Sequence, residues 1–250
     1  MGLVLALLTQ APAVWLTQAL AHASGERLLW QDPQGTVWNG SAQWALSDGG
    51  TRTNTSSAAL PSRVQWQLWP HLDLAHTRVG LRATVASTCC LPQPVLVDVA
   101  PLWRGIQVQV SDHTSHWPAA TLVGLGAPWN TVQPDGQLQL HTQGLQWTRQ
   151  ANVERLQGDA ELQWQHLSTQ LSTLRPLGSY RVRLQGGDTM ALTLDTLEGS
   201  LRLQGSGHLQ NGRVLFSGEA SAVPDAEAAL SNLLNILGQR QGAKSILKLG

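Results

Sequence analysis

The chain of 250 residues is long enough for one large domain or two small ones with a sizeable apolar core. Only 13% of its residues are charged, and Lys and Arg balance Asp and Glu to a formal net charge of zero. Nucleic-acid phosphates require a basic protein face, so this composition argues against a nucleic-acid partner.

Residues 1–23 contain no Asp, Glu, Lys or Arg. A membrane span needs about 20 mainly apolar residues, so we predict a transmembrane helix that anchors the chain over 1–23. A cleaved signal peptide is one alternative, because Ala19-Leu-Ala21 and Ala21-His-Ala23 resemble cleavage sites; a buried soluble helix is another. No Lys or Arg precedes the stretch, so charge gives no orientation. Whichever alternative is right, we expect residues 24–250 to lie outside the cytoplasm.

Apolar and polar residues alternate over much of the remaining chain. Successive side chains of a strand point to opposite faces, so this alternation predicts strands with one apolar and one wet face, which is typical of antiparallel sheets. The alternating segments are 79–85, 106–110, 137–140, 180–184, 191–194 and 201–204. Asn211-Gly212 fits a two-residue hairpin loop. We therefore predict a mainly β fold with a curved antiparallel sheet.

One helix is expected near the end of the chain. Pro224-Asp225 favours a helix start, and Gly238 favours a helix stop. Between them, leucines recur at helical spacing and predict one buried stripe: Leu230, Leu233, Leu234 and Leu237. A final strand is expected over 245–249.

A weak internal repeat links the two halves of the chain. Similar tripeptides, Gly40-Ser-Ala42, Gly158-Asp-Ala160 and Gly218-Glu-Ala220, each begin a strand-like run. The dipeptide Gln-Trp also recurs in both halves, ending at Trp44, Trp66, Trp147 and Trp164. The repeat predicts two related β-layers with a join near 125–135, within one domain over 24–250.

The cysteines, Cys89 and Cys90, are adjacent. A disulfide between neighbours closes a strained ring, so the pair does not read as the disulfide framework of a small secreted domain. Two interpretations remain: a vicinal redox switch, or two small residues at a strand end.

Several residues are of types that bind partners or metal ions in other proteins. Trp38 lies between Gly35 and Gly40 and reads as an interfacial anchor, a partner contact or a core residue beneath a turn. Zinc needs three or four converging ligands, whereas we expect His113-Thr-Ser-His116 to form a solvated loop. The other candidate ligands are Asp112, which precedes His113, and the earlier histidines His71 and His76. We predict no metal site.

No catalytic pattern is evident either. The segment from Gly124 to Trp129 lacks the Lys-Ser/Thr of a phosphate loop and reads as a turn. Ser206 between Gly205 and Gly207 only partly matches a nucleophile motif and lies in a strand pattern. Four carboxylates are considered for acid–base roles, and we expect them to be solvent-facing or turn residues: Asp98, Asp188, Asp195 and Glu198. We therefore predict no catalytic or cofactor-binding residues, no cofactor, and no enzymatic activity.

An ordered set of motifs resembles the type II secretion system protein N family. Gly35-Thr-Val-Trp38-Asn-Gly40-Ser-Ala42 follows the apolar stretch, and Val64-Gln-Trp66-Gln-Leu68-Trp-Pro70 comes next. Leu145-Gln-Trp147, Gly158 to Trp164 and Arg175 to Tyr180 follow in the family's order. No basic stub precedes the apolar stretch, so orientation rests on this resemblance alone.

The resemblance implies a single-pass inner-membrane protein whose bulk lies in the periplasm. It implies an accessory, non-enzymatic role in exporting folded proteins across the outer membrane, with other subunits of the secretion system and the inner membrane as partners. Exposed strand edges would then receive partner strands. The C-terminal helix and strand also look like the end of AsmA-type envelope proteins, so the alternative function is lipid handling with lipid as the ligand.

Overall fold

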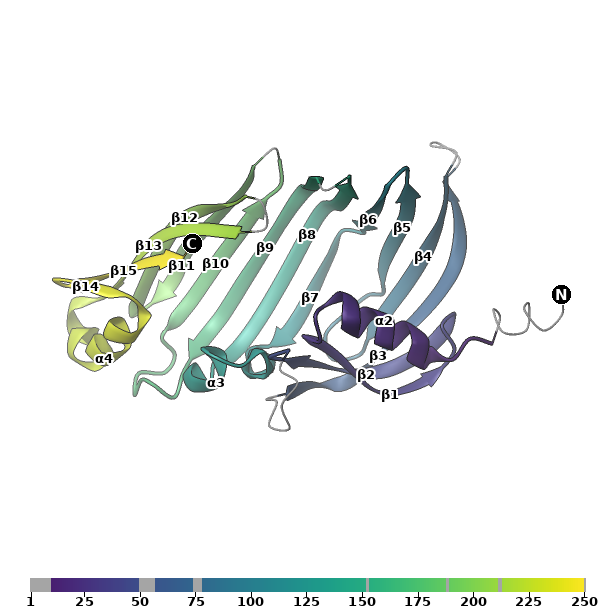
Figure 1. Cartoon of the computed structure of the whole chain (residues 1–250). Coiled ribbons are helices and arrows are strands. Elements are labelled where there is room, and N and C mark those ends of the chain that lie inside the picture. Colours follow the sequence, from purple (N-terminus) through teal and green to yellow (C-terminus); the bar gives the residue numbers. More distant parts are fainter. Residues whose placement is uncertain are drawn as a thin grey trace. The chain divides into compact units, whose positions relative to one another are not determined.

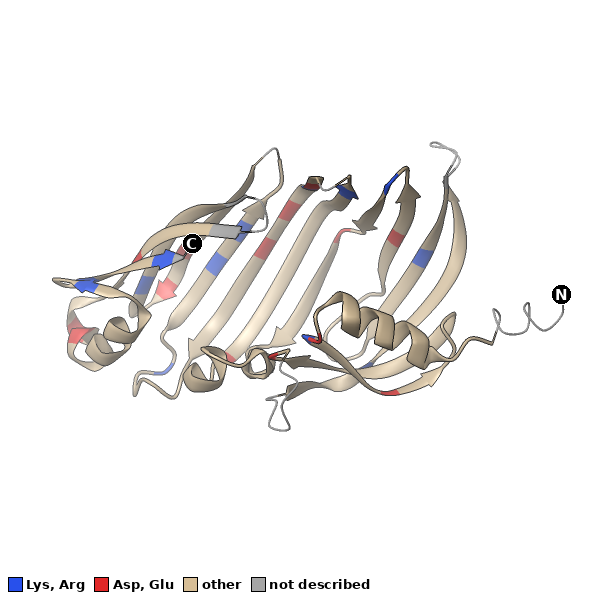
Figure 2. Ribbon diagram, in the orientation of Figure 1, with Lys and Arg blue, Asp and Glu red and all other residues tan. Residues whose placement is uncertain are grey.

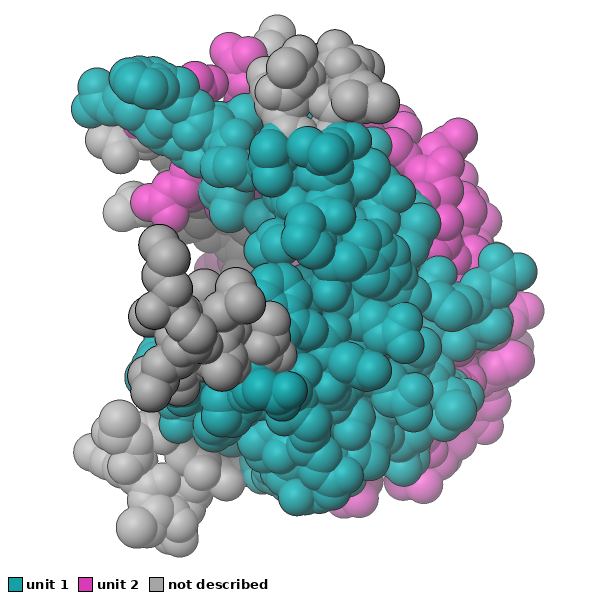
Figure 3. Space-filling view, turned by 90° about the vertical axis from the view of Figure 1, so that its right-hand side faces the viewer, with its two compact units in different colours: residues 1–111, 120–131 teal, residues 112–119, 132–250 magenta. Residues whose placement is uncertain are grey.

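The computed structural model describes residues 10–49, 57–73, 78–151, 153–187, 189–210 and 213–249. The chain divides into two compact units, residues 1–111 with 120–131 and residues 112–119 with 132–250, which Figure 3 colours separately. Both units consist mainly of antiparallel strands (Figure 1). The predicted mainly β, antiparallel class is therefore confirmed, and so is a helix near the C-terminus.

The first unit contains the following elements, in chain order: α2 (Ala13–Ala23), β1 (Leu28–Gly35), β2 (Asn39–Ser47), β3 (Ser57–Asp73), β4 (Arg78–Ser87), β5 (Val95–Leu102) and β6 (Gly105–Val110). The 3-10 helix η1 (Ala119–Leu125) and the short helix α3 (Trp129–Val132) come later in the chain. Each strand from β1 to β6 pairs antiparallel with the next one.

The second unit contains β7 (His113–Pro118), β8 (Asp135–Gln150), β9 (Val153–Ser168), β10 (Gly178–Gln185), β11 (Met190–Gly199), β12 (Leu201–Gln210), β13 (Arg213–Ala222), η2 (Pro224–Ala226), α4 (Glu227–Leu237), β14 (Gln239–Gln241) and β15 (Lys244–Leu249). Strands β8 to β13 pair antiparallel in chain order, and β7 pairs with β8. After α4 the chain returns, and β15 pairs with both β13 and β14. The expected final strand is thus confirmed.

The strand register gives each sheet an apolar face. In the second unit, Leu140 lies opposite Leu162, Leu162 opposite Val182, and Val182 opposite Leu194. Because side chains alternate between faces, their polar neighbours in sequence lie on the other face. Charged positions are sparse along the strands (Figure 2), because only 13% of the residues are charged. The alternation in the sequence therefore predicted the sides of the sheet correctly.

Helix α4 covers one end of this apolar face. Its leucine stripe is confirmed, because Leu230, Leu233 and Leu234 are buried against Tyr180 and Leu201. The helix is 11 residues, or about 16 Å, long, whereas β8 has 16 residues and spans about 53 Å. The helix therefore closes a local core and cannot cover the whole length of the strands.

The ends of α4 differ in detail from the prediction. Pro224 begins a 3-10 turn, and the α-helix itself starts at Glu227. Gly238 follows the helix but has an extended backbone with φ −174°, so no left-handed stop is present. A Cβ at this position would lie 2.9 Å from the carbonyl carbon of Ile246. Glycine is required here because the returning strand β15 passes so close.

The predicted membrane span over 1–23 is not confirmed, and residues 1–9 of it lie outside the described ranges. Residues 13–23 form α2, whose Ala13 and Thr17 are buried; Ala13 packs against Ala42 and Trp66 of the sheet. Just before the helix, the Ala11 carbonyl accepts a hydrogen bond from the Val37 N–H (2.8 Å), and Pro12 forms a bridge with Thr36. Other apolar residues of the helix, Val14, Trp15 and Leu20, are exposed. Within the described residues, no helix has both the length and the apolar character needed to cross a bilayer.

Some predictions fall on residues outside the described ranges. They concern residues 1–9, His76, Asp188 and the Asn211-Gly212 loop. The internal duplication with a join near 125–135 stays a prediction.

Candidate interaction surfaces

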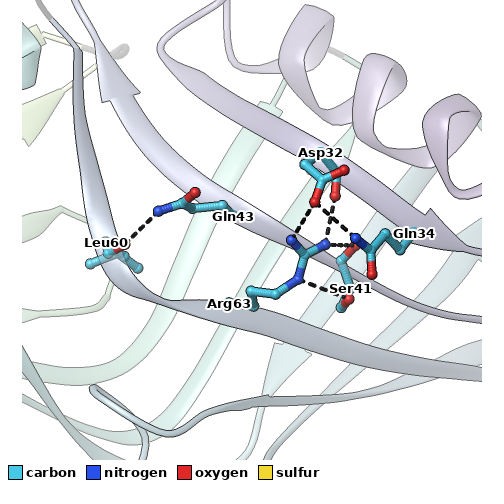
Figure 4. Close-up of polar contacts among 6 residues, drawn as sticks. All are labelled: Asp32, Gln34, Ser41, Gln43, Leu60 and Arg63. Atoms are coloured by element: carbon cyan, nitrogen blue, oxygen red, sulfur yellow. Dashed lines mark hydrogen bonds and ion pairs between the residues drawn. The ribbon is translucent and has the colours of Figure 1, made fainter.

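Strand β1 carries an irregularity that is held by a polar network (Figure 4). The register with β2 shifts between Gln31 and Gln34, and Asp32 has a positive φ of 47°. The Arg63 guanidinium reaches this bulge from β3, with its Nη1 atom 2.8 Å from Asp32 Oδ2 and its Nη2 donating to the Asp32 carbonyl (2.6 Å). The same side chain donates to the Ser41 hydroxyl and carbonyl, both at 3.2 Å. Arg63 therefore ties three strands together at the bulge.

This network makes β1 a poor template for an added strand. A bulge and a proline both disrupt the row of backbone groups that another strand would need, and β1 has Pro33 within its bulge. In the second unit, the outer strand β14 has only three residues and includes the exposed Arg240. Short length and charge likewise protect a sheet edge. Both features disfavour the strand addition that we expected from the sequence.

The turn between β1 and β2 explains the glycines of the G-T-V-W-x-G motif. Gly35 has φ +84°, a conformation that favours glycine, and Thr36 closes the turn by three hydrogen bonds with the Asn39 backbone. A Cβ on Gly40 would lie 2.6 Å from the Trp66 ring and 2.8 Å from the Thr36 carbonyl oxygen. The motif is therefore required for a tight turn that packs against a tryptophan.

The buried tryptophan at this turn is Trp66, whereas Trp38 is half-buried. The Trp66 Nε1–H donates to the Val37 carbonyl (3.0 Å), and its ring meets Trp30 edge to face at 6.2 Å. In the sequence, the flanking glycines made Trp38 a candidate, whereas the role of Trp66 was not predicted. The alternation in Val64-Gln-Trp66 was the available signal, since it places Trp66 on the apolar face.

An apolar depression at the far end of β3 to β6 was not foreseen from the sequence. It has a volume of about 440 Å³. Its lining consists of prolines, glycines and aliphatic residues from these strands: Pro70, Val79, Gly80, Leu81, Val99, Pro101, Gly105 and Ile106. The alternation in 79–85 and 106–110 predicted an apolar face, but it could not indicate that this part of the face would stay exposed.

Cys89 and Cys90 form a disulfide in the turn after β4. Cys90 is buried and Cys89 is exposed. The Cys89 N–H donates to the Ser62 hydroxyl (3.1 Å), which also lies 2.9 Å from the Ser87 hydroxyl. The pair therefore lies just beyond the end of a strand, as one interpretation expected, and its sulfurs are joined; the redox switch stays a prediction.

The histidines of the 113–116 segment do not converge. They lie in strand β7, not in the solvated loop that we expected, and an odd spacing of three places His113 and His116 on opposite faces. His113 Nδ1 lies 2.8 Å from the Thr142 hydroxyl, and Asp112 accepts a hydrogen bond from the Gly144 N–H (2.7 Å). His71 lies 3.2 Å from Arg82. In the part of the chain that is described, no group of three His, Cys, Asp or Glu could hold a metal ion.

The two glycine-containing segments have packing roles. A short helix, α3, does begin at Trp129 after a cis Ala127-Pro128 bond, although no helix was expected there. Gly124 lies against the backbone of Leu46 and Ala58, where a Cβ would not fit. Gly205 similarly makes room for the Phe216 ring within the sheet. Ser206 lies in the middle of β12 with its side chain exposed.

The candidate carboxylates are dispersed. Asp98 binds Arg82 through both oxygens, at 2.6 and 2.8 Å, and this hydrogen bonding raises the pKa of the arginine. Asp98 is therefore half-buried and paired, contrary to the expected solvent-facing role. Glu198 accepts a hydrogen bond from the Ser179 hydroxyl (3.0 Å), and Asp195 is exposed on β11.

A second charged cluster lies on the wet face of β9 and β10. Glu161 accepts from Arg183 Nε (2.8 Å) and from Gln163 (2.6 Å), and Arg181 Nε lies 3.2 Å away. The hydrogen bond from Arg183, followed by that from Gln163, lowers the pKa of the Glu161 carboxyl. A lowered pKa in the folded state means that the ionised carboxylate stabilises the fold.

We expect the Glu161→Gln variant to lose about 0.5–1 kcal/mol of unfolding free energy at neutral pH, a value discounted for solvent screening. Because the folded pKa is depressed, this contribution is complete above the pKa of a free glutamate, about 4.3, and disappears as the pH falls through the folded value. Urea unfolding from pH 7 down to pH 3 measures this loss. Glu154→Gln, which removes a more exposed pair with Arg149 (3.7 Å), is the matched control and should change stability less. Equal curves for both variants at all pH values would contradict the prediction.

Comparison with known proteins gives one finding. A family model described as type II secretion system (T2SS), protein N, matches residues 26–246. No curated protein and no solved structure matches the chain significantly. The matched range begins just before β1 and ends within β15, so it includes the strands of both units. The chain therefore belongs to the type II secretion system protein N family.

Proposed function

We propose that the chain is an accessory, non-enzymatic subunit of the type II secretion system that supports the export of folded proteins across the outer membrane. It acts in the periplasm through contacts with other subunits of the system. The observation that carries this proposal is the family match over 26–246, which covers the β-scaffold of both units. The match covers the strands of both units, which is expected for a protein that acts by binding partners on its surface.

The arrangement of charged groups supports a binding role. Several ion pairs join one cation to one carboxylate between strands: Arg82–Asp98 and Lys244–Glu219 link neighbouring strands, and Arg63–Asp32 links β3 to β1. Acid–base catalysis needs titratable groups that converge beside a substrate-sized pocket. The paired groups lie on the wet faces of the sheets, where they stabilise strand pairing.

The proposed location is the periplasmic side of the inner membrane, with a single-pass anchor. The family membership supports this location. Ala11 and Pro12 are hydrogen-bonded and bridged to the turn at Thr36 and Val37, so the start of α2 lies beside the β1–β2 turn.

The proposed partner contacts use the faces of the sheets. Pro33 and the bulge disfavour pairing along β1, and β14 is too short for a stable ladder. Side chains on a sheet face can instead bury large apolar groups at a partner surface. Exposed Leu72 on a sheet face of the first unit and exposed Ile236 on helix α4 of the second are suitable positions for detecting partner contacts.

Photo-crosslinking in intact cells tests the proposal. A photoreactive residue placed singly at Leu72, Trp103, Val153 or Ile236, all exposed, should form light-dependent adducts with secretion subunits from at least one position. Deleting the chain should reduce export and leave folded substrates in the periplasm. Adducts only with unrelated envelope proteins, together with normal export after deletion, would refute the proposed role.

A further inference from the structure

The apolar face of the first unit becomes more exposed with distance from α2. Trp66 and Val95 are buried, and Leu68 is half-buried where it packs beside the helix contact. Further along the same face, Leu72 on β3 and Val79 on β4 lie opposite one another and are 65% and 61% exposed. Helix α2 therefore covers only one end of the face. The depression described above lies at the uncovered end.

The chemistry of the depression suits a hydrocarbon chain. Cross-strand pairs Pro70–Leu81, Leu81–Val99 and Pro101–Ile106 form a continuous apolar lining. The backbone groups of these strands pair with one another in the ladder, so few remain to bind a polar ligand. An extended protein segment would bring its own backbone N–H and C=O groups onto this surface and leave them unsatisfied. An acyl chain has no such groups. The volume of about 440 Å³ falls within the usual range for small-ligand sites.

The rim of the depression carries a positive charge, which suits an anionic head group. Leu102 pairs with Gly105, so Trp103 and Arg104 form the two-residue loop between β5 and β6, directly beside Ile106. Trp103 is 88% exposed, and Arg104 is exposed as well. Arg104 has φ +64°, a conformation that favours glycine, so the fold keeps an arginine where a glycine would be less strained. A guanidinium binds phosphate oxygens well, and tryptophan prefers the boundary between lipid and water.

We infer that this end of the first unit binds a membrane phospholipid. The acyl chain lies against Val79, Leu81 and Ile106, and the anionic head group binds Arg104 beside Trp103. This inference goes beyond the proposed function, which concerns contacts with secretion subunits and does not require a lipid.

Titration of the full-length chain with two single-chain amphiphiles tests the inference. The probes are palmitoyl lysophosphatidylglycerol, which is anionic, and monopalmitoylglycerol, which has the same chain but no phosphate; native mass spectrometry and the methyl NMR signals of Leu81 and Ile106 report binding. Val79→Asp should weaken binding of both probes by about tenfold or more, because it places a charge against the acyl chain. Val153→Asp is the matched control, since Val153 is 56% exposed but lies in the second unit, and it should leave binding unchanged.

The head-group contact has its own variant. Arg104→Gln should weaken binding of the anionic probe by about three- to fivefold, as expected for an exposed charge pair, and should leave the neutral probe unchanged. Ile106→Asn, on a different strand from Val79, provides a second lining variant if Val79→Asp loses the near-UV circular dichroism of the folded chain. The inference is overturned if the wild type and both lining variants bind the probes with equal affinity. It is also overturned if the wild type binds the two probes with equal affinity and Arg104→Gln changes neither affinity. If no lipid binds, and a photoreactive residue at position 79 forms light-dependent adducts with a secretion subunit, then the surface docks a protein and the inference is overturned.

Discussion

Replacing Leu234 by alanine is expected to lower the free energy of unfolding by about 2–5 kcal/mol, the largest class of effect for a single aliphatic residue. Leu234 is 0% exposed and belongs to the core formed by α4 with β10, β12 and β13. Truncation removes apolar contacts and leaves a cavity that surrounding strands fill only partly. The Leu234 carbonyl also accepts a hydrogen bond from the buried Ser245 hydroxyl (2.6 Å), so its backbone links α4 to β15.

Ile236→Ala on the same helix is the matched control. Ile236 is 54% exposed, so its truncation should change the unfolding free energy by about 0.5 kcal/mol or less, as for an ordinary surface position. Urea denaturation followed by circular dichroism compares the two variants with the wild type, and the slope should stay constant if unfolding remains two-state. Similar losses for both variants would mean that α4 does not pack through its leucine stripe.

The second large effect is expected for Trp66→Ala, which should lower the free energy of unfolding of the first unit by about 3–5 kcal/mol. Trp66 is 5% exposed and packs against Ala13 of α2 and Ala42 of β2. Its truncation removes the contact with Trp30 and leaves the Val37 carbonyl without the indole donor. Because the ring lies between the sheet and the helix, α2 should detach more readily.

Trp69→Ala is the control for this variant. Trp69 lies on the same strand but on the opposite face, and it is 38% exposed, so a smaller loss is expected. Hydrogen exchange resolved by segment should show faster exchange of residues 13–23 in Trp66→Ala and little change in Trp69→Ala. Unchanged protection of α2 in Trp66→Ala would show that the helix does not depend on this ring.

The strands and the C-terminal helix could be predicted because their signals are local. Alternation over 180–184 and 201–204 identified β10 and β12, and the leucine stripe identified the buried side of α4. A strand or helix repeats its orientation every few residues, so a short segment is enough to show which side chains share a face. Its period does not show what will cover that face.

Two errors have a common origin in this limit. The segment of His113 looked like a polar loop, because its pairing partner, β8, begins beyond a turn and two short helices. Asp98 looked solvent-facing because its partner Arg82 lies on the neighbouring strand. In each case the missing information was a contact between distant segments.

The sequence by itself determined the mainly β class, the faces of the strands and the C-terminal helix, since backbone period and side-chain polarity act over a few residues. Tertiary structure alone decided which apolar surfaces are buried and which stay open. Trp66 and Val79 both belong to apolar alternating segments, but α2 covers the first and leaves the second exposed. Burial depends on the length and position of the covering element, and a helix of 11 residues is shorter than the strand β3 beneath it, which has 17.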